Sequence, residues 1–300
     1  MNNKNMKVLV TGGEGFIGSS FIKKFSNEFD FVVISSKKND CKKIVKTEYV
    51  SVSDKKIIKT IENLNPDVVI HFAAFSGLKK CETEPEQAFN INVTGTANVV
   101  KGCLRTNARL IFISTREVYG PTISKESNEA DLLNPINIYG KTKMKAEKII
   151  QKDAKNSGLN YIILRLTNVY GPGSDSGVNN IIRKSLSEGK ISVNGGEQVL
   201  NFIFIEDVIE LIHLVLLNGK LFRQIFNIGS KDTISLKKFV EILMGLSNNK
   251  VDVEFGKKPN FESLFFRPDI KKQQNILAYN SKISLKEGIN KTLQYMKINL

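Results

Sequence analysis

A glycine-rich turn between an apolar strand and an amphipathic helix is the feature that most constrains the fold of this chain. Residues 6–11 (MKVLVT) form a short apolar run that predicts a buried strand. Gly12, Gly15 and Gly18 follow at intervals of three, and residues 16–25 place apolar side chains on one face of a predicted helix. Glycines at this spacing permit a tight turn and let a phosphate approach the backbone at the helix N-terminus. The turn therefore predicts a dinucleotide-binding fold.

Strands and helices continue to alternate along the chain. The apolar runs that predict further strands are 31–36, 66–74, 108–115 and 160–166. Two long helical patterns lie at 84–107 and 137–158. Because the predicted strands are apolar on both faces, both faces of their sheet must be covered by helices. We therefore expect an α/β fold: a Rossmann-like, doubly wound parallel sheet.

The composition restricts the class of partner. The 300 residues are 41% hydrophobic and 25% charged, which is ordinary for a globular protein with a sizeable core. The formal net charge is +14, but the lysines are dispersed and no basic helix carries interleaved aromatic residues, so no nucleic-acid partner is expected. A basic surface also suits a diphosphate substrate. No apolar run reaches the ~20 residues of a membrane helix and no signal peptide is evident, so we expect no membrane partner and a cytoplasmic location.

The cysteines and histidines point to neither disulfides nor a metal. Three scattered cysteines, Cys41, Cys81 and Cys103, are typical of reduced thiols. His71 and His213 have no cysteine or histidine partner at ligand spacing, so we expect no metal site. His71 ends a predicted buried strand and is expected to be packed and hydrogen-bonded rather than a catalytic base.

Tyr139 and Lys143 are candidates for proton transfer. They are four residues apart in a predicted helix and therefore share one of its faces. An ordinary tyrosine has a pKa of about 10, too high for proton transfer near neutrality. A lysine ammonium together with a positively charged nicotinamide would lower the pKa of Tyr139, which could then accept a proton from a sugar hydroxyl.

The chain resembles the extended short-chain dehydrogenase/reductase family in its nucleotide-sugar epimerase/dehydratase branch. The segments that carry the resemblance, in family order, are TGGEGFIG, VVIHFAA, FNINVTGT, ISTREVYG, NIYGKTK, ILRLTNVYGPG, NFIFIEDV, IFNIGS and RPDIKK…LKEGINKTLQYM. The resemblance implies a dinucleotide-binding Rossmann domain at 1–171, to which 196–229 return. It also implies that 172–300 mainly form a smaller C-terminal α/β substrate-binding lobe.

The resemblance assigns a set of residues to NAD or NADP. The implied cofactor-binding residues are Gly12, Gly15, Phe16, Ile17 and Gly18 at the pyrophosphate, Ser35, Ser36 and Lys37 at the ribose, Asp54 near the adenine, and Val52, Phe72, Ala73 and Ala74 along the dinucleotide. Lys143 would hold the nicotinamide ribose, next to Tyr139. Asn92 would stabilise the active-site helix.

The resemblance also assigns the chemistry and the sugar. Thr115 would hydrogen-bond the reacting hydroxyl, Tyr139 would be the acid/base, and Glu117 matches a glutamate that dehydratases and decarboxylases use. The implied substrate-binding residues are Thr115, Arg116, Asn168 and Arg267. A homodimer joined through two helices of each subunit, here 86–104 and 140–154, is implied as well.

Two departures from the family pattern affect binding. The predicted strand 31–36 ends without the acidic residue that usually accepts the ribose 2′-hydroxyl, and Ser35, Ser36, Lys37 and Lys38 stand there instead. We therefore expect that NADP is tolerated and slightly preferred to NAD. In addition, Leu200 replaces an arginine that often pairs with a substrate phosphate. The sequence leaves open whether Arg267, Lys258 or Arg183 compensates.

The third departure is Arg116, which follows Thr115 at the end of a predicted strand. Some 4,6-dehydratases of the family carry an aspartic acid at this position, and a guanidinium is a poor proton donor. If strand geometry continued, Thr115 and Glu117 would point to one face and Arg116 to the other. Two roles stay open for Arg116: an ion pair with a nearby carboxylate, or bidentate binding of an anionic sugar such as a uronic acid.

The function expected from these features is that of a nucleotide-sugar 4-epimerase. Tyr139 would remove the C4 hydroxyl proton, and the transient 4-keto sugar would turn over before the hydride returns. An NADPH-dependent 4-ketoreductase would use the same Thr115, Tyr139 and Lys143. A UDP-uronate decarboxylase or a 4,6-dehydratase is a further alternative. A dinucleotide sensor without activity is the least favoured reading, because Tyr139 and Lys143 are both retained.

Overall fold

Seven parallel strands form the central sheet of the structure, a computed structural model that describes residues 6–36, 45–122, 126–174, 177–187, 189–247 and 251–299. The strands are β1 (Lys7–Thr11), β2 (Asp30–Ser35), β3 (Lys46–Tyr49), β4 (Val68–His71), β5 (Arg109–Thr115), β7 (Tyr161–Leu166) and β11 (Gln224–Ile228). Their order is β11-β7-β5-β4-β1-β2-β3. The chain therefore runs outward from β1 in one direction, returns, and continues from β4 in the other. This reversal creates a crevice beyond the carboxyl ends of β1 and β4.

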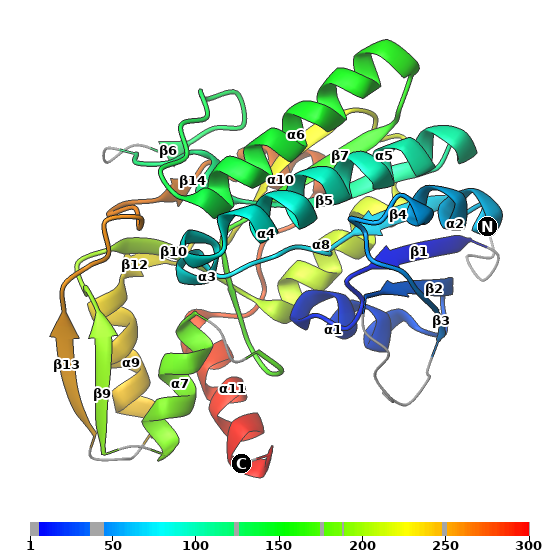
Figure 1. Cartoon of the computed structure of the whole chain (residues 1–300). Helices are drawn as coiled ribbons and strands as arrows, with labels where there is room; N and C mark the ends of the chain where they lie inside the picture. The colour runs from blue at the N-terminus through cyan, green and yellow to red at the C-terminus, as the bar shows by residue number, and fades with distance from the viewer. Residues whose placement is uncertain are drawn as a thin grey trace.

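Helices cover both faces of this sheet (Figure 1). On one face lie α2 (Lys56–Leu64), α5 (Gly95–Thr106) and α6 (Ile138–Ser157). On the other face lie α1 (Phe16–Phe25) and α8 (Ile205–Leu217), which pack against each other. The Rossmann-like, doubly wound sheet predicted from the sequence is thereby confirmed.

Alternation along the strands explains why two cores form. In β1, the side chains of Val8 and Val10 belong to the core under α1 and α8, whereas Leu9 belongs to the core under α2, α5 and α6. In β5, Ile111 and Phe112 divide between the two cores in the same way. Successive side chains of a strand point to opposite faces, so continuous apolar runs bury both.

Smaller sheets and helices build a second, C-terminal lobe, seen at the lower left of Figure 1. The pair β9 (Lys190–Asn194) and β13 (Asp252–Gly256) lies there with α7 (Val178–Ser187), α9 (Leu236–Ser247) and α11 (Leu285–Asn299). The remaining strands are β8 (Asn168–Tyr170), β10 (Val199–Phe204) and β12 (Thr233–Ser235), which form one sheet, and β6 (Glu126–Ser127) and β14 (Arg267–Pro268), which pair with each other. Helix α10 (Lys271–Leu277) lies outside this lobe and packs against β11 and α8.

The helix predicted at 84–107 is interrupted. It consists of α4 (Pro85–Phe89), a π-helical turn at Asn90–Thr94, and α5, and it is preceded by the short α3 (Leu78–Thr83). Periodicity alone does not reveal a π-helical turn, which inserts one residue into an otherwise helical pattern. Such turns commonly serve to place a particular side chain, and here the turn contains the buried Asn92.

None of the helices in the described part of the chain is long and apolar enough to cross a membrane.

Candidate active site

The glycine-rich turn has the geometry that a pyrophosphate requires. Gly12 has φ +70°, and a Cβ atom added to it would stand 2.6 Å from the backbone nitrogen of Ala73. A Cβ atom on Gly18 would stand 2.5 Å from the carbonyl oxygen of Gly12. At such distances neither Gly12 nor Gly18 can carry a side chain. The absence of side chains lets the start of α1 pack directly against the turn. The first backbone N–H groups of α1 are therefore available to a negatively charged group.

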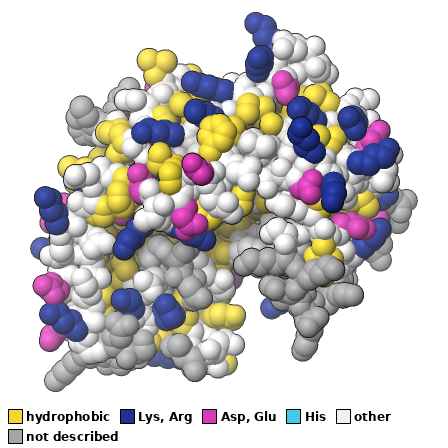
Figure 2. All heavy atoms as spheres, viewed as in Figure 1, with side chains coloured by type: hydrophobic (Ala, Val, Ile, Leu, Met, Phe, Trp, Pro, Cys, Tyr) yellow, Lys and Arg dark blue, Asp and Glu magenta, His cyan; other side chains and the backbone are white. Residues whose placement is uncertain are grey.

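A cavity of about 1320 Å³ begins at this turn. Most of the predicted cofactor residues line it: Gly12, Gly15, Phe16, Ile17, Gly18, Ser35, Ser36, Val52, Phe72, Ala73, Ala74 and Tyr139. The cavity continues past Thr115, Arg116 and Glu117 to Asn168 and the second lobe. On the face seen in Figure 2, the surface is hollowed between the two parts of the molecule, and cationic and anionic side chains are interspersed. One continuous cavity thus joins the glycine turn to the predicted catalytic residues, and these residues fit a bound dinucleotide.

A chain of hydrogen bonds fixes the crevice between β1 and β4. The hydroxyl of Thr11 accepts a hydrogen bond from the backbone N–H of Ala73 and lies 2.6 Å from Nδ1 of His71. Nε2 of His71 lies 3.1 Å from the hydroxyl of Thr96, which itself donates to the carbonyl of Asn92. His71 therefore donates through Nε2 and accepts at Nδ1. Burial, assisted by the charge of Lys143, lowers the pKa of His71 to about 3. His71 is packed, hydrogen-bonded and neutral, as the sequence predicted.

Tyr139 lies in the first turn of α6 and lines the cavity. Asn137 caps this helix, because its side-chain oxygen accepts a hydrogen bond from the backbone N–H of Gly140 at 2.7 Å. Burial, followed by the proximity of Cys81 and Glu117, raises the pKa of Tyr139 above its ordinary value. The sequence predicts that Lys143 together with a positively charged nicotinamide ring lowers the pKa of Tyr139. Lys143 alone does not lower this pKa.

Lys143 lies one turn further along α6 and is 1% exposed. Its ammonium stands 3.9 Å from the centre of the Phe112 ring. Burial lowers the pKa of Lys143 to about 7, against the opposing effect of Glu147. Lys143 does not line the cavity directly but lies behind its wall. The ammonium is thus desolvated and held close to its titration point.

A buried polar network fixes α6 against the sheet. The carboxylate of Glu147 accepts hydrogen bonds from Ser114 in β5 and from the guanidinium of Arg165 in β7, with Nη2 2.7 Å away. The same guanidinium donates to the hydroxyl of Tyr119, which donates to Asn227 in β11. A buried network of this kind is rigid when each member has its partners. It holds the helix that carries Tyr139 and Lys143 in register with three strands.

Arg116 forms an ion pair with its sequence neighbour. Strand β5 ends at Thr115, and Arg116–Val118 form a 3₁₀-helical turn capped by the hydroxyl of Thr115, which accepts from the backbone N–H of Glu117. Strand geometry therefore does not persist beyond Thr115, so the condition under which Arg116 and Glu117 would point to opposite faces is not met. The Arg116 guanidinium lies 2.8 Å from the Glu117 carboxylate, and Asn137 donates to the same carboxylate at 2.6 Å.

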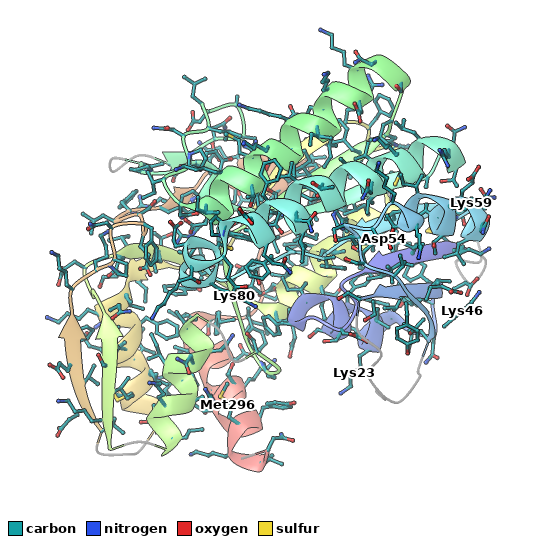
Figure 3. The ribbon with its side chains drawn as sticks, viewed as in Figure 1. Lys23, Lys46, Asp54, Lys59, Lys80 and Met296 are labelled. Carbon is teal, nitrogen blue, oxygen red and sulfur yellow. The ribbon has the colours of Figure 1, made fainter. Side chains whose placement is uncertain are left out.

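Two other predicted residues lie outside the cavity lining. Asp54 is exposed, and its carboxylate accepts a hydrogen bond from the backbone N–H of Lys56 at the start of α2 (Figure 3). Ser51 and Val52 line the cavity in that region instead. Arg267 is exposed, with its guanidinium 5.8 Å from the Phe265 ring. The structure therefore does not bring Asp54 or Arg267 to the cavity.

Asn92 is buried behind the lining rather than in it. Its side chain accepts from the backbone N–H of Phe75 at 2.8 Å and donates to the Phe75 carbonyl. It also donates to the hydroxyl of Thr142 on α6 at 2.9 Å. Asn92 thus connects the loop after β4 to the helix of Tyr139, which matches its predicted stabilising role. Lys37 and Cys41 lie outside the described residues.

The part of the cavity nearest the second lobe carries amides and hydroxyls. Asn168, Asn180, Ser192 and Asn194 line it, together with Leu200. None of the three cations proposed to compensate for Leu200 lines this cavity within the described ranges. Arg183 donates to Asn180, Lys258 donates to the carbonyl of Pro259 and to that of Glu262, and Arg267 is exposed.

Sequence reasoning missed several lining residues with polar or charged side chains, among them Glu14, Ser51, Lys79 and Glu262. Burial raises the pKa of Glu262, whose carboxylate accepts a hydrogen bond from Gln198. Glu14 stands inside the glycine-rich turn itself, so its position beside the dinucleotide was inferable from the spacing of the glycines. Ser51 and Glu262 come from loops whose path the sequence does not specify, and Lys79 lies at the start of the short α3.

The described residues contain no group of three or more His, Cys, Asp or Glu side chains that could hold a metal ion. Cys81 and Cys103 are free and buried.

The doubly wound sheet, the glycine turn and the Thr115, Tyr139 and Lys143 set define an extended short-chain dehydrogenase/reductase. Residues 8–229 match the NAD dependent epimerase/dehydratase family. The chain belongs to this family of enzymes.

Relatives in sequence cover almost the whole chain. A Methanocaldococcus jannaschii protein named "Putative UDP-glucose 4-epimerase" is 31% identical over 97% of this chain and 99% of its own length. A human dTDP-D-glucose 4,6-dehydratase is 28% identical over 98% of this chain and 90% of its own length. These relatives support the assignment of the chain to the family. Their names also show that members of the family carry out more than one reaction.

Solved structures of epimerases share the fold. UDP-glucose 4-epimerase from Thermotoga maritima, with UDP-glucose, has a TM-score of 0.91 at 26% identity and covers 98% of this chain and 99% of its own. UDP-glucuronic acid 4-epimerase from Bacillus cereus, in complex with UDP-glucuronic acid and NAD, has a TM-score of 0.91 at 25% identity and covers 98% of this chain and 100% of its own.

Proposed function

We propose that this protein is a nucleotide-sugar 4-epimerase. The observation that carries the proposal is the single cavity in which the glycine turn, Thr115 and Tyr139 meet the amides of Asn168 and Asn194. A bound nicotinamide dinucleotide would supply the hydride acceptor and donor. Tyr139 takes the proton of the C4 hydroxyl and returns it to the epimeric alkoxide. Thr115 orients that hydroxyl. Lys143 lies behind the cavity wall and is proposed to contact the nicotinamide ribose from there.

The ion pair of Arg116 and Glu117 supports epimerisation over dehydration. A guanidinium cannot serve as the acid for a departing C6 hydroxyl. The carboxylate of Glu117 is engaged by both Arg116 and Asn137, so it is bound as a structural acceptor rather than left available as a base. Elimination of water needs an acid for the C6 hydroxyl and a base, and neither Arg116 nor Glu117 is available for these roles.

The second lobe is proposed to bind the nucleotide diphosphate. Residues 172–300 mainly form this lobe in our division, and 1–171 with 196–229 form the dinucleotide domain. Lys79, at the start of the short α3, lines the same cavity as Asn168 and Asn180 and is exposed. It can neutralise part of the diphosphate charge in place of the arginine that Leu200 replaces. Relatives that bind UDP-sugars favour a uridine nucleotide.

A one-way 4-ketoreductase is the second candidate. It would use Thr115, Tyr139 and Lys143 in the same positions, because reduction of a ketone needs the same proton donor. The replacement of an acidic residue by Ser35 at the end of β2 is the observation that favours it, since NADPH carries a 2′-phosphate.

We propose that the protein forms a homodimer through α4, α5 and α6. Phe89 on α4 is 43% exposed, and the ammonium of Lys145 on α6 lies 4.9 Å from its ring centre. The exposed ring of Phe89 on α4 and the side chain of Lys145 on α6 thus lie side by side. Sedimentation analysis should give the mass of a dimer, and a monomer at working concentration would contradict this proposal.

A panel of UDP-, dTDP-, GDP- and CDP-sugars, incubated with and without NADPH, tests the function. We expect one sugar to be converted without a change of mass and without added NADPH, as read by NMR and mass spectrometry. A gain of two hydrogens would replace the epimerase with the ketoreductase. Loss of water or of carbon dioxide would instead support a dehydratase or a decarboxylase.

A further inference from the structure

A carboxylate from the glycine-rich turn stands at the end of β2. Ser35 is the last residue of β2 and is 5% exposed. Its hydroxyl donates a hydrogen bond of 2.8 Å to Oε2 of Glu14, which lies in the turn between β1 and α1. Both residues line the large cavity. The turn and the second strand are thus connected by a side-chain contact that faces the predicted dinucleotide site.

The register of the sheet places this contact at the ribose. β1 and β2 are parallel neighbours in which Thr11 pairs with Ile34, and the backbone N–H of Gly12 donates to the carbonyl of Ile34. Ser35 therefore ends β2 at the level where the turn begins. In a doubly wound fold, the side chain at this place is the one that meets the adenosine ribose, and an acidic group there accepts the 2′-hydroxyl.

We propose that Glu14 replaces the acidic residue that β2 lacks, and that it makes the protein selective for NAD over NADP. The inference rests on the dinucleotide binding of the proposed function. Ser35 holds one carboxylate oxygen, and the other oxygen remains able to accept the ribose 2′-hydroxyl. A 2′-phosphate carries nearly two negative charges at neutral pH, so the same carboxylate repels it.

This inference reverses the preference for NADP predicted from Ser35, Ser36 and the following lysines. That prediction considered the strand end alone. Glu14 comes from a different segment, which the fold brings against Ser35. Glu14 is also exposed on its outer side, so the side chain can be substituted without opening the core.

Direct binding measurements test the inference without a sugar. The affinities for NAD⁺ and NADP⁺ are measured by calorimetry for the wild-type chain and for Glu14→Gln, which keeps an acceptor for Ser35 but loses the charge. Glu14→Ala is a second variant that removes the acceptor as well. Glu241→Gln, at an exposed acidic residue of α9 that pairs with Lys238, is the matched control.

We expect the wild-type chain to bind NAD⁺ at least about tenfold more tightly than NADP⁺, which corresponds to about 1.4 kcal/mol. In both Glu14 variants the ratio should fall severalfold, chiefly because NADP⁺ binds better, and Glu241→Gln should keep the wild-type ratio. A wild-type preference for NADP⁺ that disappears in Lys37→Ala/Lys38→Ala would overturn the inference and assign selectivity to the lysines. An unchanged ratio in the Glu14 variants would overturn it as well.

These outcomes differ from a failure of the proposed function. If the wild-type chain bound neither dinucleotide, the epimerase proposal would fall and this inference with it. If it bound both with equal affinity, only the inference about Glu14 would fall.

Discussion

The guanidinium of Arg116 lies 2.8 Å from the carboxylate of Glu117, its neighbour in sequence, and the two side chains are only 8% and 6% exposed. The pair forms because the chain leaves the strand at Thr115 and enters a 3₁₀-helical turn. It lies at the wall of the cavity, so its disruption has consequences for both stability and substrate choice.

Replacement of Arg116 by methionine should leave the buried Glu117 carboxylate with the hydrogen bond from Asn137 but without its ion pair, and should destabilise the protein by about 3 kcal/mol. The double variant Arg116→Met/Glu117→Gln should recover much of this loss, because the uncompensated charge is removed. Urea denaturation measures both changes. Arg105→Ala, which breaks the exposed pair with Glu62, is the control and should cost less than about 1 kcal/mol. Unchanged stability with loss of uronate binding would instead show that Arg116 serves an anionic sugar.

Tyr139→Phe should lower the turnover rate of the nucleotide sugar by a factor of about 10²–10⁴, because the proton of the C4 hydroxyl then has no acceptor. Dinucleotide binding should stay within about twofold of wild type, since the ring is retained. Tyr295→Phe, at an exposed tyrosine of α11, is the control. Unchanged turnover in Tyr139→Phe would rule out the acid/base role of this residue.

Lys143 should make stability depend on pH. Burial lowers the pKa of Lys143 from 10.5 to about 7, so the unfolded chain binds this proton more tightly than the folded chain does. The contribution of Lys143 to the free energy of unfolding therefore rises as pH increases from about 7 toward 10.5. Below pH 7 this contribution stays at its lowest value, because the lysine is protonated in both states. The melting temperature of wild type minus that of Lys143→Met should increase between pH 7 and pH 9. A constant difference would show that the ammonium is solvated in the folded chain.

Asn92→Ala should destabilise the protein by about 1–3 kcal/mol for each Phe75 backbone group left without a partner, because these groups remain buried. Urea denaturation again provides the measurement. Asn63→Ala, at an exposed site in α2, should leave stability equal or slightly raised, since alanine favours a helix. Equal losses in the two variants would contradict the role of Asn92 as a connector to α6.

Gly12→Ala should weaken dinucleotide binding by at least about tenfold, because a Cβ atom would stand 2.6 Å from the nitrogen of Ala73 at φ +70°. The left-handed backbone itself adds a cost of about 1–2 kcal/mol. Gly219→Ala is a matched substitution, since a Cβ atom at Gly219 meets nothing within 4 Å. Calorimetric titration with NAD⁺ compares the two variants, and similar affinities would show that the turn does not hold the pyrophosphate.

The sheet, the glycine turn and the Tyr139 and Lys143 pair were predictable because each depends on a local pattern. Periodicity identifies buried strands, and glycine spacing identifies the turn. An ion pair was one of the two roles left open for Arg116, but its partner, Glu117, was not predictable, since the sequence does not show that β5 ends at Thr115. The π-helical turn around Asn92 depends on contacts between separate segments, in which Asn92 bonds to Phe75 and to Thr142. The place of Glu14 in the turn was inferable from the glycine spacing, but its contact with Ser35 was not, because the two residues are 21 apart in sequence.

The last strand of the main sheet, β11, is supplied by residues 224–228, far beyond the first six strands. During synthesis, β7 must wait with one edge unpaired until that segment leaves the ribosome, and α1 waits for α8. A fragment ending at residue 171 would therefore expose an open strand edge and an uncovered apolar face, and it should aggregate rather than fold. Nascent molecules are thus most vulnerable, and most in need of chaperones, while the residues between β7 and β11 are being made.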